Sequence, residues 1–230
     1  MEVVGIEARV RYMLFITIRW RYIKMNRGGI PEKIDFLAAD ASYSSSAPKT
    51  LGVGADEFTL VQQSPTVKVY RRGGDILIAL RGTQVTDTRD LAADASIAIN
   101  RLTYSDRVKA DEQFMDVLLR RFPSQTYNYF VTGHSLGGAE LLVFMRKYPF
   151  IRGGVAYNSA LQPQDLIWPP GATVKEIYTS TDPLYRLMGH FLARKTVIDA
   201  ENLSKGTDIV SQGLDALSSH KLSQFAGLYR

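Results

Sequence analysis

One stretch constrains this chain more than any other. A β-type segment, residues 127–132, runs into the sequence Gly-His-Ser-Leu-Gly (133–137) and then into an apolar helical segment. A Gly-x-Ser-x-Gly pattern between a strand and a helix predicts a sharp turn, with Ser135 in a strained backbone conformation and its hydroxyl clear of the sheet. Gly133 and Gly137 suit this turn, because a Cβ at either position would collide with the neighbouring strand or helix. The helix would direct its free N–H groups toward a carbonyl oxygen that becomes negative.

Helical and strand patterns alternate along the rest of the chain, which predicts an α/β fold with a mainly parallel central sheet flanked by helices. Helices are expected over residues 31–43, with Pro31 in the first turn, and from Ser105 as N-cap to about Phe122. Residues 44–54 are expected to form a loop. Strands are expected over residues 58–61, 67–70, 76–80, 153–158, 173–179 and 196–199, the second and third forming a hairpin through Gly73-Gly74-Asp75.

Residues 1–25 differ from the rest in charge and composition. Of the net charge of +5, four units lie in residues 1–27, where six basic residues accompany two acidic ones. The apolar run 12–20 is shorter than the roughly 20 residues that a spanning helix needs, and arginines follow it where a signal peptide has a cleavage site. Such a segment can lie on an anionic membrane surface, but we favour an edge strand or a disordered extension ahead of an alternative start at Met25. Residues 26–230 then form one domain.

Composition excludes several classes of function. The chain has no cysteine, so it has no disulfide, thiolate nucleophile or cysteine zinc site. Outside residues 1–27 the charge is near neutral, which argues against a nucleic-acid partner. Without a convincing signal peptide or transmembrane helix, we expect a location in the cytoplasm or at the periphery of a membrane. No sequence feature specifies an oligomeric state.

A serine hydroxyl becomes a nucleophile when a base takes its proton and a carboxylate orients that base. The three histidines are His134, His190 and His220. His134 adjoins Ser135 in the turn, where consecutive side chains diverge, and His190 follows Asp182 by only eight residues. Asp182 stands at the end of a predicted strand, on the same sheet edge as Ser135. The chain order Ser135, Asp182, His220 is the one expected of an α/β-hydrolase.

Two of these residues have simpler interpretations. Asp182 precedes Pro183, and Asp followed by Pro is a common helix start, so Asp182 could act only as an N-cap. His220 could be an ordinary surface histidine near the C-terminus.

A second polar turn follows the expected strand 76–80. It reads Arg-Gly-Thr-Gln (81–84) and stands at the C-terminal end of that strand, the edge where open α/β sheets bind ligands. Residues 87–99 follow, with a pattern that suits a helix or a lid-like connection.

At four places the chain resembles the class 3 lipases of the α/β-hydrolase superfamily. Residues 79–83 (Ala-Leu-Arg-Gly-Thr) resemble the family's oxyanion strand, and residues 132–138 (Thr-Gly-His-Ser-Leu-Gly-Gly) match its elbow. Residues 178–183 resemble the strand end that carries the acid, and residues 220–225 resemble the family's histidine motif. The likeness covers about residues 30–226.

The resemblance implies a role for each matched position. Ser135 would be the nucleophile, Asp182 the orienting acid and His220 the base, with Thr83 and the backbone N–H of Leu136 as the oxyanion hole. Residues 84–100 fall where the family has its lid. The chain departs from the family at Glu140 and Leu141, where the family prefers small and apolar residues. The helix after the elbow therefore packs differently or brings a carboxylate near the site.

The main hypothesis is a serine ester hydrolase, a lipase or phospholipase that cleaves acyl esters of lipids through a Ser-His-Asp triad and an acyl-enzyme. This chemistry requires neither a metal nor an organic cofactor. Its partner would be a lipid or another ester, with peripheral membrane contact. Two alternatives remain at this stage: a non-catalytic lipase-like protein that uses the cleft for binding or assembly, and an acyltransferase that uses the same triad.

Overall fold

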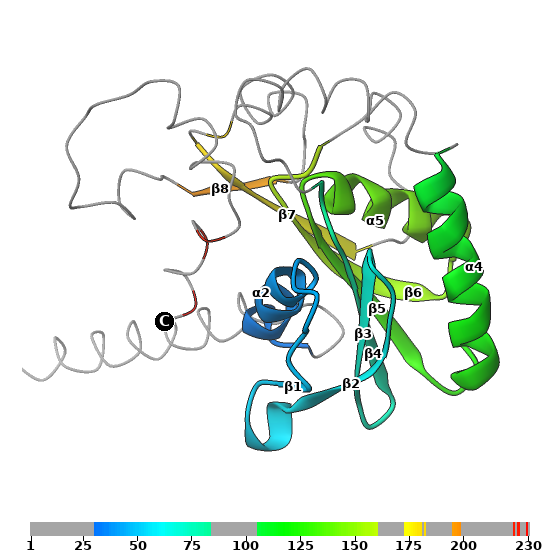
Figure 1. Ribbon diagram of the computed structural model, residues 1–230. Helices are drawn as coiled ribbons and strands as arrows, with labels where there is room; N and C mark the ends of the chain where they lie inside the picture. Colours follow the sequence, from blue (N-terminus) through cyan, green and yellow to red (C-terminus); the bar gives the residue numbers. More distant parts are fainter. Residues whose placement is uncertain are drawn as a thin grey trace, which may run out of the picture.

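An eight-stranded sheet forms the centre of the described structure (Figure 1). The computed structural model describes residues 30–83, 105–160, 173–180, 182 and 195–198, together with residues 223, 225 and 229. The spatial order of the strands equals their order in the chain. The strands are β1 (Thr50–Leu51), β2 (Phe58–Gln63), β3 (Val67–Arg72), β4 (Asp75–Leu80), β5 (Asn128–His134), β6 (Ile151–Tyr157), β7 (Thr173–Thr179) and β8 (Lys195–Ile198).

The sheet has an antiparallel half and a parallel half. β1 to β4 pair antiparallel, and β4 to β8 pair parallel. Only two residues, Gly73 and Gly74, join β3 to β4, and Gly73 has a φ of +54°, which a short hairpin turn accepts readily from glycine. Parallel neighbours need a longer crossover, and α4 (Asp106–Arg121) and α5 (Leu136–Lys147) lie in two of these crossovers.

Helices cover both faces of the sheet (Figure 1). Side chains alternate between the two faces along a strand, so β4 can be buried on both sides. Its residues Ile76, Ile78 and Leu80 pack in the cluster that contains α4 and α5. Its residues Leu77 and Ala79 pack in the cluster with α2 (Glu32–Ala41) on the opposite face. This double burial explains the continuously apolar sequence of β4.

Most expected elements are confirmed, with small changes in their bounds. The side chain of Ser105 caps α4 by accepting a hydrogen bond of 3.2 Å from the backbone N–H of Val108. The expectation of a plain loop over residues 44–54 was wrong in part. That segment contains β1, and its last residue begins a 3₁₀ turn, η1 (Gly54–Asp56). β1 forms because Leu51 pairs with Phe58 and packs beside it.

Several expectations concern residues outside the described part of the chain. These are the extension at residues 1–25, the lid-like connection at residues 84–100, and both His190 and His220. Among the residues that are described, no helix is both long and apolar enough to cross a membrane.

Candidate active site

Ser135 occupies the strained turn that its sequence context predicts. β5 ends at His134 and α5 begins at Leu136, and Ser135 between them has φ 57° and ψ −123°. A conformation of this kind costs on the order of 1–3 kcal/mol and persists only where the surroundings enforce it. Here the Ser135 N–H donates to the Tyr157 carbonyl at 3.0 Å, and the Ser135 carbonyl accepts from the Ala160 N–H at 3.0 Å.

The two glycines of the turn are required by backbone contacts, as the sequence predicts. A Cβ on Gly133 would lie 2.3 Å from the Gly137 carbonyl oxygen, and a Cβ on Gly137 would lie 2.2 Å from the Leu80 carbonyl oxygen. Neither neighbour can give way, because both are backbone atoms inside regular elements. The small residues therefore allow α5 to begin in direct contact with the ends of β4 and β5.

The polar turn after β4 lies directly beside Ser135. A Cβ on Gly82 would stand 3.1 Å from the Ser135 Cβ and 2.6 Å from the His134 carbonyl oxygen. The next residue, Thr83, is exposed and lines a pocket of about 680 Å³ together with Leu136. Leu136 is the first residue of α5, where N–H groups have no partner within the helix. The two residues predicted to form an oxyanion hole thus border one pocket.

Tyr43 connects the elbow to this turn, and sequence reasoning missed it. Its hydroxyl lies 2.7 Å from His134 Nδ1 and accepts a hydrogen bond of 3.1 Å from the Gly82 N–H. Burial raises the pKa of the Tyr43 hydroxyl, so the group stays protonated and can donate to the ring nitrogen. Nδ1 of His134 is therefore engaged by Tyr43.

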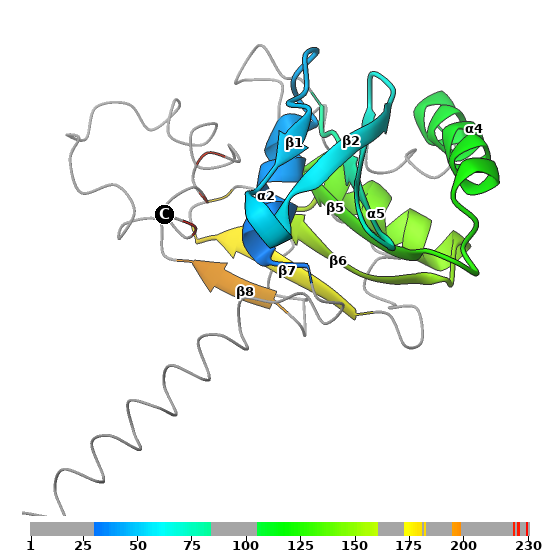
Figure 2. The ribbon, with the colours of Figure 1, turned by 90° about the horizontal axis from the view of Figure 1, so that it is seen from below.

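Asp182 lies on the same sheet edge as Ser135 and is fully buried. It follows β7, and its N–H donates to the Thr179 carbonyl at 3.1 Å. Since β5, β6 and β7 run parallel (Figure 2), their C-terminal ends share this edge. Two strand spacings separate β5 from β7, which is roughly 10 Å and leaves room for one imidazole ring between serine and carboxylate. The predicted base, His220, lies outside the described residues.

Asn158 ties the end of β6 to the end of β7 and was also missed from the sequence. It has a positive φ of 42°, which asparagine tolerates better than most residues. Its N–H donates to the Ile177 carbonyl at 2.9 Å, and its side-chain oxygen accepts from the Thr179 N–H at 3.0 Å. These bonds define the position from which the chain continues to Asp182.

The carboxyl group of Glu140, in α5, is fully buried where α5 meets α4. Its Oε2 lies 3.0 Å from Nε and 2.9 Å from Nη2 of Arg107. Burial raises the pKa of Glu140 to about 8, and this effect outweighs the opposing attraction of Arg107. Arg107 also approaches Asp111, with Nε 3.8 Å from Oδ2, and donates to the Arg81 carbonyl. Glu140, where the chain departs from the family, thus pairs with Arg107, and this pair links α5 and α4 to the end of β4.

No protein-family model matches the chain, and a comparison with curated proteins found no match. Two solved structures are similar at low identity. A mutant form of MDLA from Penicillium cyclopium shares 19% identity over 82% of each chain, with a TM-score of 0.42. A predicted CIB-like hydrolase from Thermoplasma acidophilum shares 13% identity over 74% of this chain and 94% of its own, with a TM-score of 0.37.

The geometry itself gives the fold class. The parallel strands β4 to β8, the helices on both faces and the strained serine between β5 and α5 constitute an α/β-hydrolase fold. A fold does not specify an activity, so the function must be argued from the site. Within the described ranges, no cluster of three or more His, Cys, Asp or Glu side chains could hold a metal ion.

Proposed function

We propose that this protein is a serine ester hydrolase that cleaves acyl esters of lipids. The observation that carries the proposal is the backbone of Ser135, which has a positive φ at the junction of β5 and α5. A serine is a poor choice at that φ for stability, since glycine adopts it without strain. A serine placed there stands at the N-terminus of a helix, where a negative oxygen can be stabilised, which favours a nucleophile.

In the proposed reaction, the Ser135 oxygen attacks the ester carbonyl while His220 accepts the hydroxyl proton. Asp182 orients His220 and stabilises the imidazolium. The Leu136 N–H and Thr83 stabilise the negative oxygen of the tetrahedral intermediate. The intermediate collapses to an acyl-enzyme as His220 returns the proton to the departing alcohol. Water then attacks the acyl carbon, His220 again takes the proton, and the carboxylic acid leaves.

Two observations support the arrangement of these groups. The close approach of Gly82 to Ser135 brings the turn with Thr83 next to the serine. The pocket beside them includes apolar side chains, among them Phe114 and Leu136, that can receive an acyl chain. Because this pocket can receive an acyl chain, we propose lipid esters as substrates rather than esters in general.

Labelling with a fluorophosphonate probe tests the serine chemistry directly. We expect the wild-type protein to be labelled on Ser135 and to hydrolyse a panel of p-nitrophenyl esters, with a preference for medium or long acyl chains. Ser135→Ala should show neither signal, whereas Ser159→Ala, which changes a buried serine after β6, should be labelled normally. A folded wild-type protein that is neither labelled nor active would favour the non-catalytic alternative. Labelling with acyl transfer to an added alcohol, at the expense of hydrolysis, would favour an acyltransferase.

A further inference from the structure

Three cationic side chains surround the end of β4, and they differ in how their charge is balanced. Arg107 lies close to the carboxyl groups of Glu140 and Asp111. Lys68 and Arg81 have no salt bridge to any carboxylate in the described part of the chain. Lys68 Nζ donates to the Ser64 carbonyl at 2.9 Å, and the buried Nε of Arg81 has no hydrogen-bond partner there.

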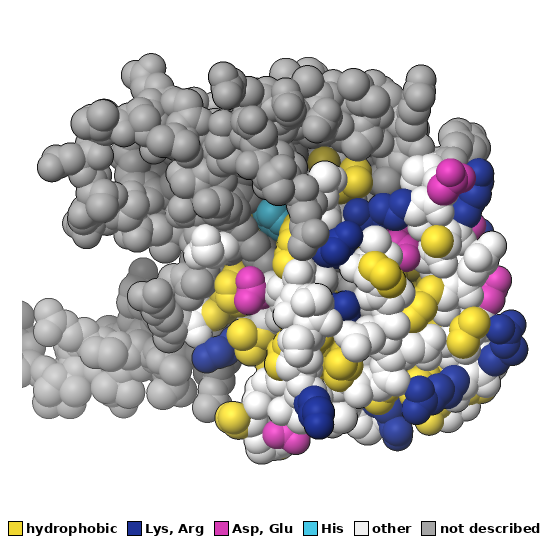
Figure 3. Space-filling model, in the orientation of Figure 1, with side chains coloured by type: hydrophobic (Ala, Val, Ile, Leu, Met, Phe, Trp, Pro, Cys, Tyr) yellow, Lys and Arg dark blue, Asp and Glu magenta, His cyan; other side chains and the backbone are white. Residues whose placement is uncertain are grey.

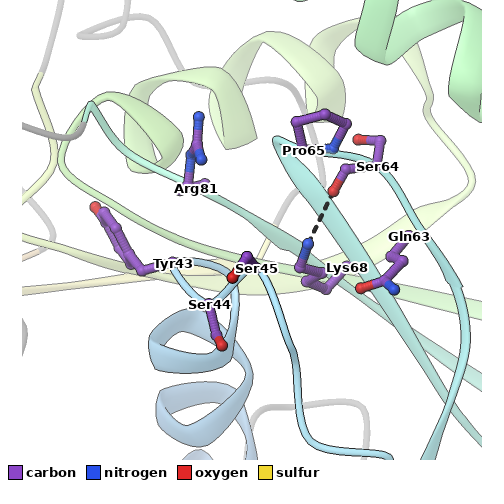
Figure 4. Close-up of a pocket in the computed structure, with 8 residues that line it drawn as sticks. All are labelled: Tyr43, Ser44, Ser45, Gln63, Ser64, Pro65, Lys68 and Arg81. Atoms are coloured by element: carbon purple, nitrogen blue, oxygen red, sulfur yellow. Dashed lines mark hydrogen bonds between the residues drawn. The ribbon is translucent and has the colours of Figure 1, made fainter.

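Lys68 and Arg81 line the same pocket, which has a volume of about 440 Å³ (Figure 4). Figure 4 shows Lys68 and Ser64 on one side of it and Tyr43 and Arg81 on the other. Ser44 and Ser45 add two hydroxyl groups to its wall. In the view of Figure 3, Lys and Arg side chains gather near the border of the described residues, with acidic side chains among them.

The charges of these two cations are not balanced by the side chains described around them. Lys68 is only 3% exposed. Burial lowers the pKa of Lys68, and the nearby positive charge of Arg81 lowers it further. A buried charge normally has a partner of opposite sign, and here the protein supplies none among its described side chains. An anion in the pocket would supply that partner.

The pocket adjoins a second pocket at the candidate active site. Its residues Ser64, Pro65 and Arg81 also line the pocket of about 680 Å³ that contains Thr83 and Leu136. A molecule with an anionic group at Lys68 and Arg81 would therefore lie beside the pocket that Thr83 and Leu136 border. Arg81 lies at the junction and is separated from the Ser135 contact residue, Gly82, by a single peptide bond.

We propose that Lys68 and Arg81, with the neighbouring serine hydroxyls, bind a phosphate group. Phosphate carries close to two negative charges and several acceptor oxygens, which match two cations and several donors better than a single carboxylate does. The phosphate group would belong to the head of an ester substrate whose acyl carbonyl reaches Ser135. This assignment of substrate class rests on the proposed ester hydrolase function, whereas the phosphate site itself does not.

The first arm of the test measures binding without catalysis. Inorganic phosphate is titrated into the Ser135→Ala protein by isothermal calorimetry at constant ionic strength. We expect Lys68→Met, which keeps the apolar stem and removes the charge, to weaken binding at least about tenfold, as loss of a charge-assisted hydrogen bond should. Lys147→Met removes the same charge from a half-exposed site at the far end of α5 and should bind as the parent does. Arg81→Gln provides a second variant should Lys68→Met fail to fold.

The second arm distinguishes a lipid head from free phosphate. Hydrolysis of soluble dihexanoyl phosphatidate is compared with that of uncharged dihexanoylglycerol. The ratio of the two kcat/KM values should fall at least about tenfold in Lys68→Met. If phosphate binds but this ratio does not move, the site takes free phosphate and the substrate assignment is overturned. If neither ester is hydrolysed by the wild type, the proposed function fails while the calorimetry still decides the phosphate site. Equal phosphate affinity in parent, Lys68→Met and Arg81→Gln would overturn the site.

Discussion

The Tyr43 hydroxyl lies 2.7 Å from His134 Nδ1, although 91 residues separate the two in sequence. The same hydroxyl accepts the Gly82 N–H. One side chain after α2 thus holds together the last residue of β5 and the turn after β4, the two segments that flank Ser135. Tyr43 is a positioning residue for the proposed chemistry, because it acts through Gly82 and His134.

Tyr43→Phe should therefore lower kcat by at least about tenfold with little change in KM, since misplacing an oxyanion donor affects mainly the transition state. The removed hydroxyl also leaves a buried N–H unsatisfied, which should cost about 1–3 kcal/mol of stability. Ester kinetics and urea denaturation measure the two effects. Tyr70→Phe is the matched control, because the Tyr70 hydroxyl is also hydrogen-bonded to the backbone, donating to the Pro48 carbonyl, but lies away from Ser135. A similar drop in kcat for both variants would show that the effect is only structural.

The strain at Ser135 can be measured separately from its chemistry. Ser135→Ala and Ser135→Gly should both lose about 10⁶-fold in turnover, as removal of a triad nucleophile does. Ser135→Gly should nevertheless be more stable than Ser135→Ala by about 1 kcal/mol, because glycine relieves the cost of the positive φ and loses part of the gain to its larger chain entropy. Thermal or urea denaturation decides this. Equal stability of the two variants would contradict a strained turn.

Glu140 should make stability depend on pH. Its pKa rises from an ordinary 4.5 to about 8 in the folded protein, mainly through burial. Between these pH values the folded state binds more protons than the unfolded state, so the free energy of unfolding falls as pH rises, by at most about 1.4 kcal/mol per unit. Below pH 4.5 the carboxyl group is protonated in both states, so the folded protein does not bear the cost of burying a charged carboxylate.

Glu140→Gln should remove this slope, so that the variant gains stability relative to the wild type as pH rises from 5 toward 8. Urea denaturation at several pH values measures the difference. Glu112→Gln is the control, because Glu112 pairs with Lys147 at the surface and should leave the slope unchanged. An unchanged slope in Glu140→Gln would mean that Arg107 keeps the carboxylate charged in the folded protein.

His220 is the predicted base, and His190 is the alternative. The thirty-eight residues from Asp182 to His220 allow the chain to return across the sheet edge, whereas the eight residues to His190 would have to double back tightly. His220→Ala should lower turnover by at least about 10²- to 10⁴-fold and abolish probe labelling. His190→Ala should remain close to the wild type. The reverse pattern would move the base to the segment after Asp182.

The parts of the fold that depend on neighbouring residues could be predicted from the sequence. The elbow is one example, because the steric demands on Gly133 and Gly137 come from residues close in the chain or at an adjacent strand end. The cap at Ser105 is another, since its bond reaches only to Val108. The apolar run of β4 predicted burial on both faces, because side chains alternate between the two faces of a strand and a continuous apolar run puts apolar residues on each.

Only the tertiary structure decided which distant residues meet around Ser135. The contacts of Tyr43 with His134 and Gly82, of Arg107 with Glu140, and of Asn158 with Thr179 join separate elements. No periodicity marks such partners, because a side chain's spacing shows which face of an element it occupies and not what packs against that face. The pairing of Lys68 with Arg81 in one pocket was likewise decided by the tertiary structure. In the sequence they are two ordinary cations, and the β3–β4 hairpin and the segment after α2 bring them together.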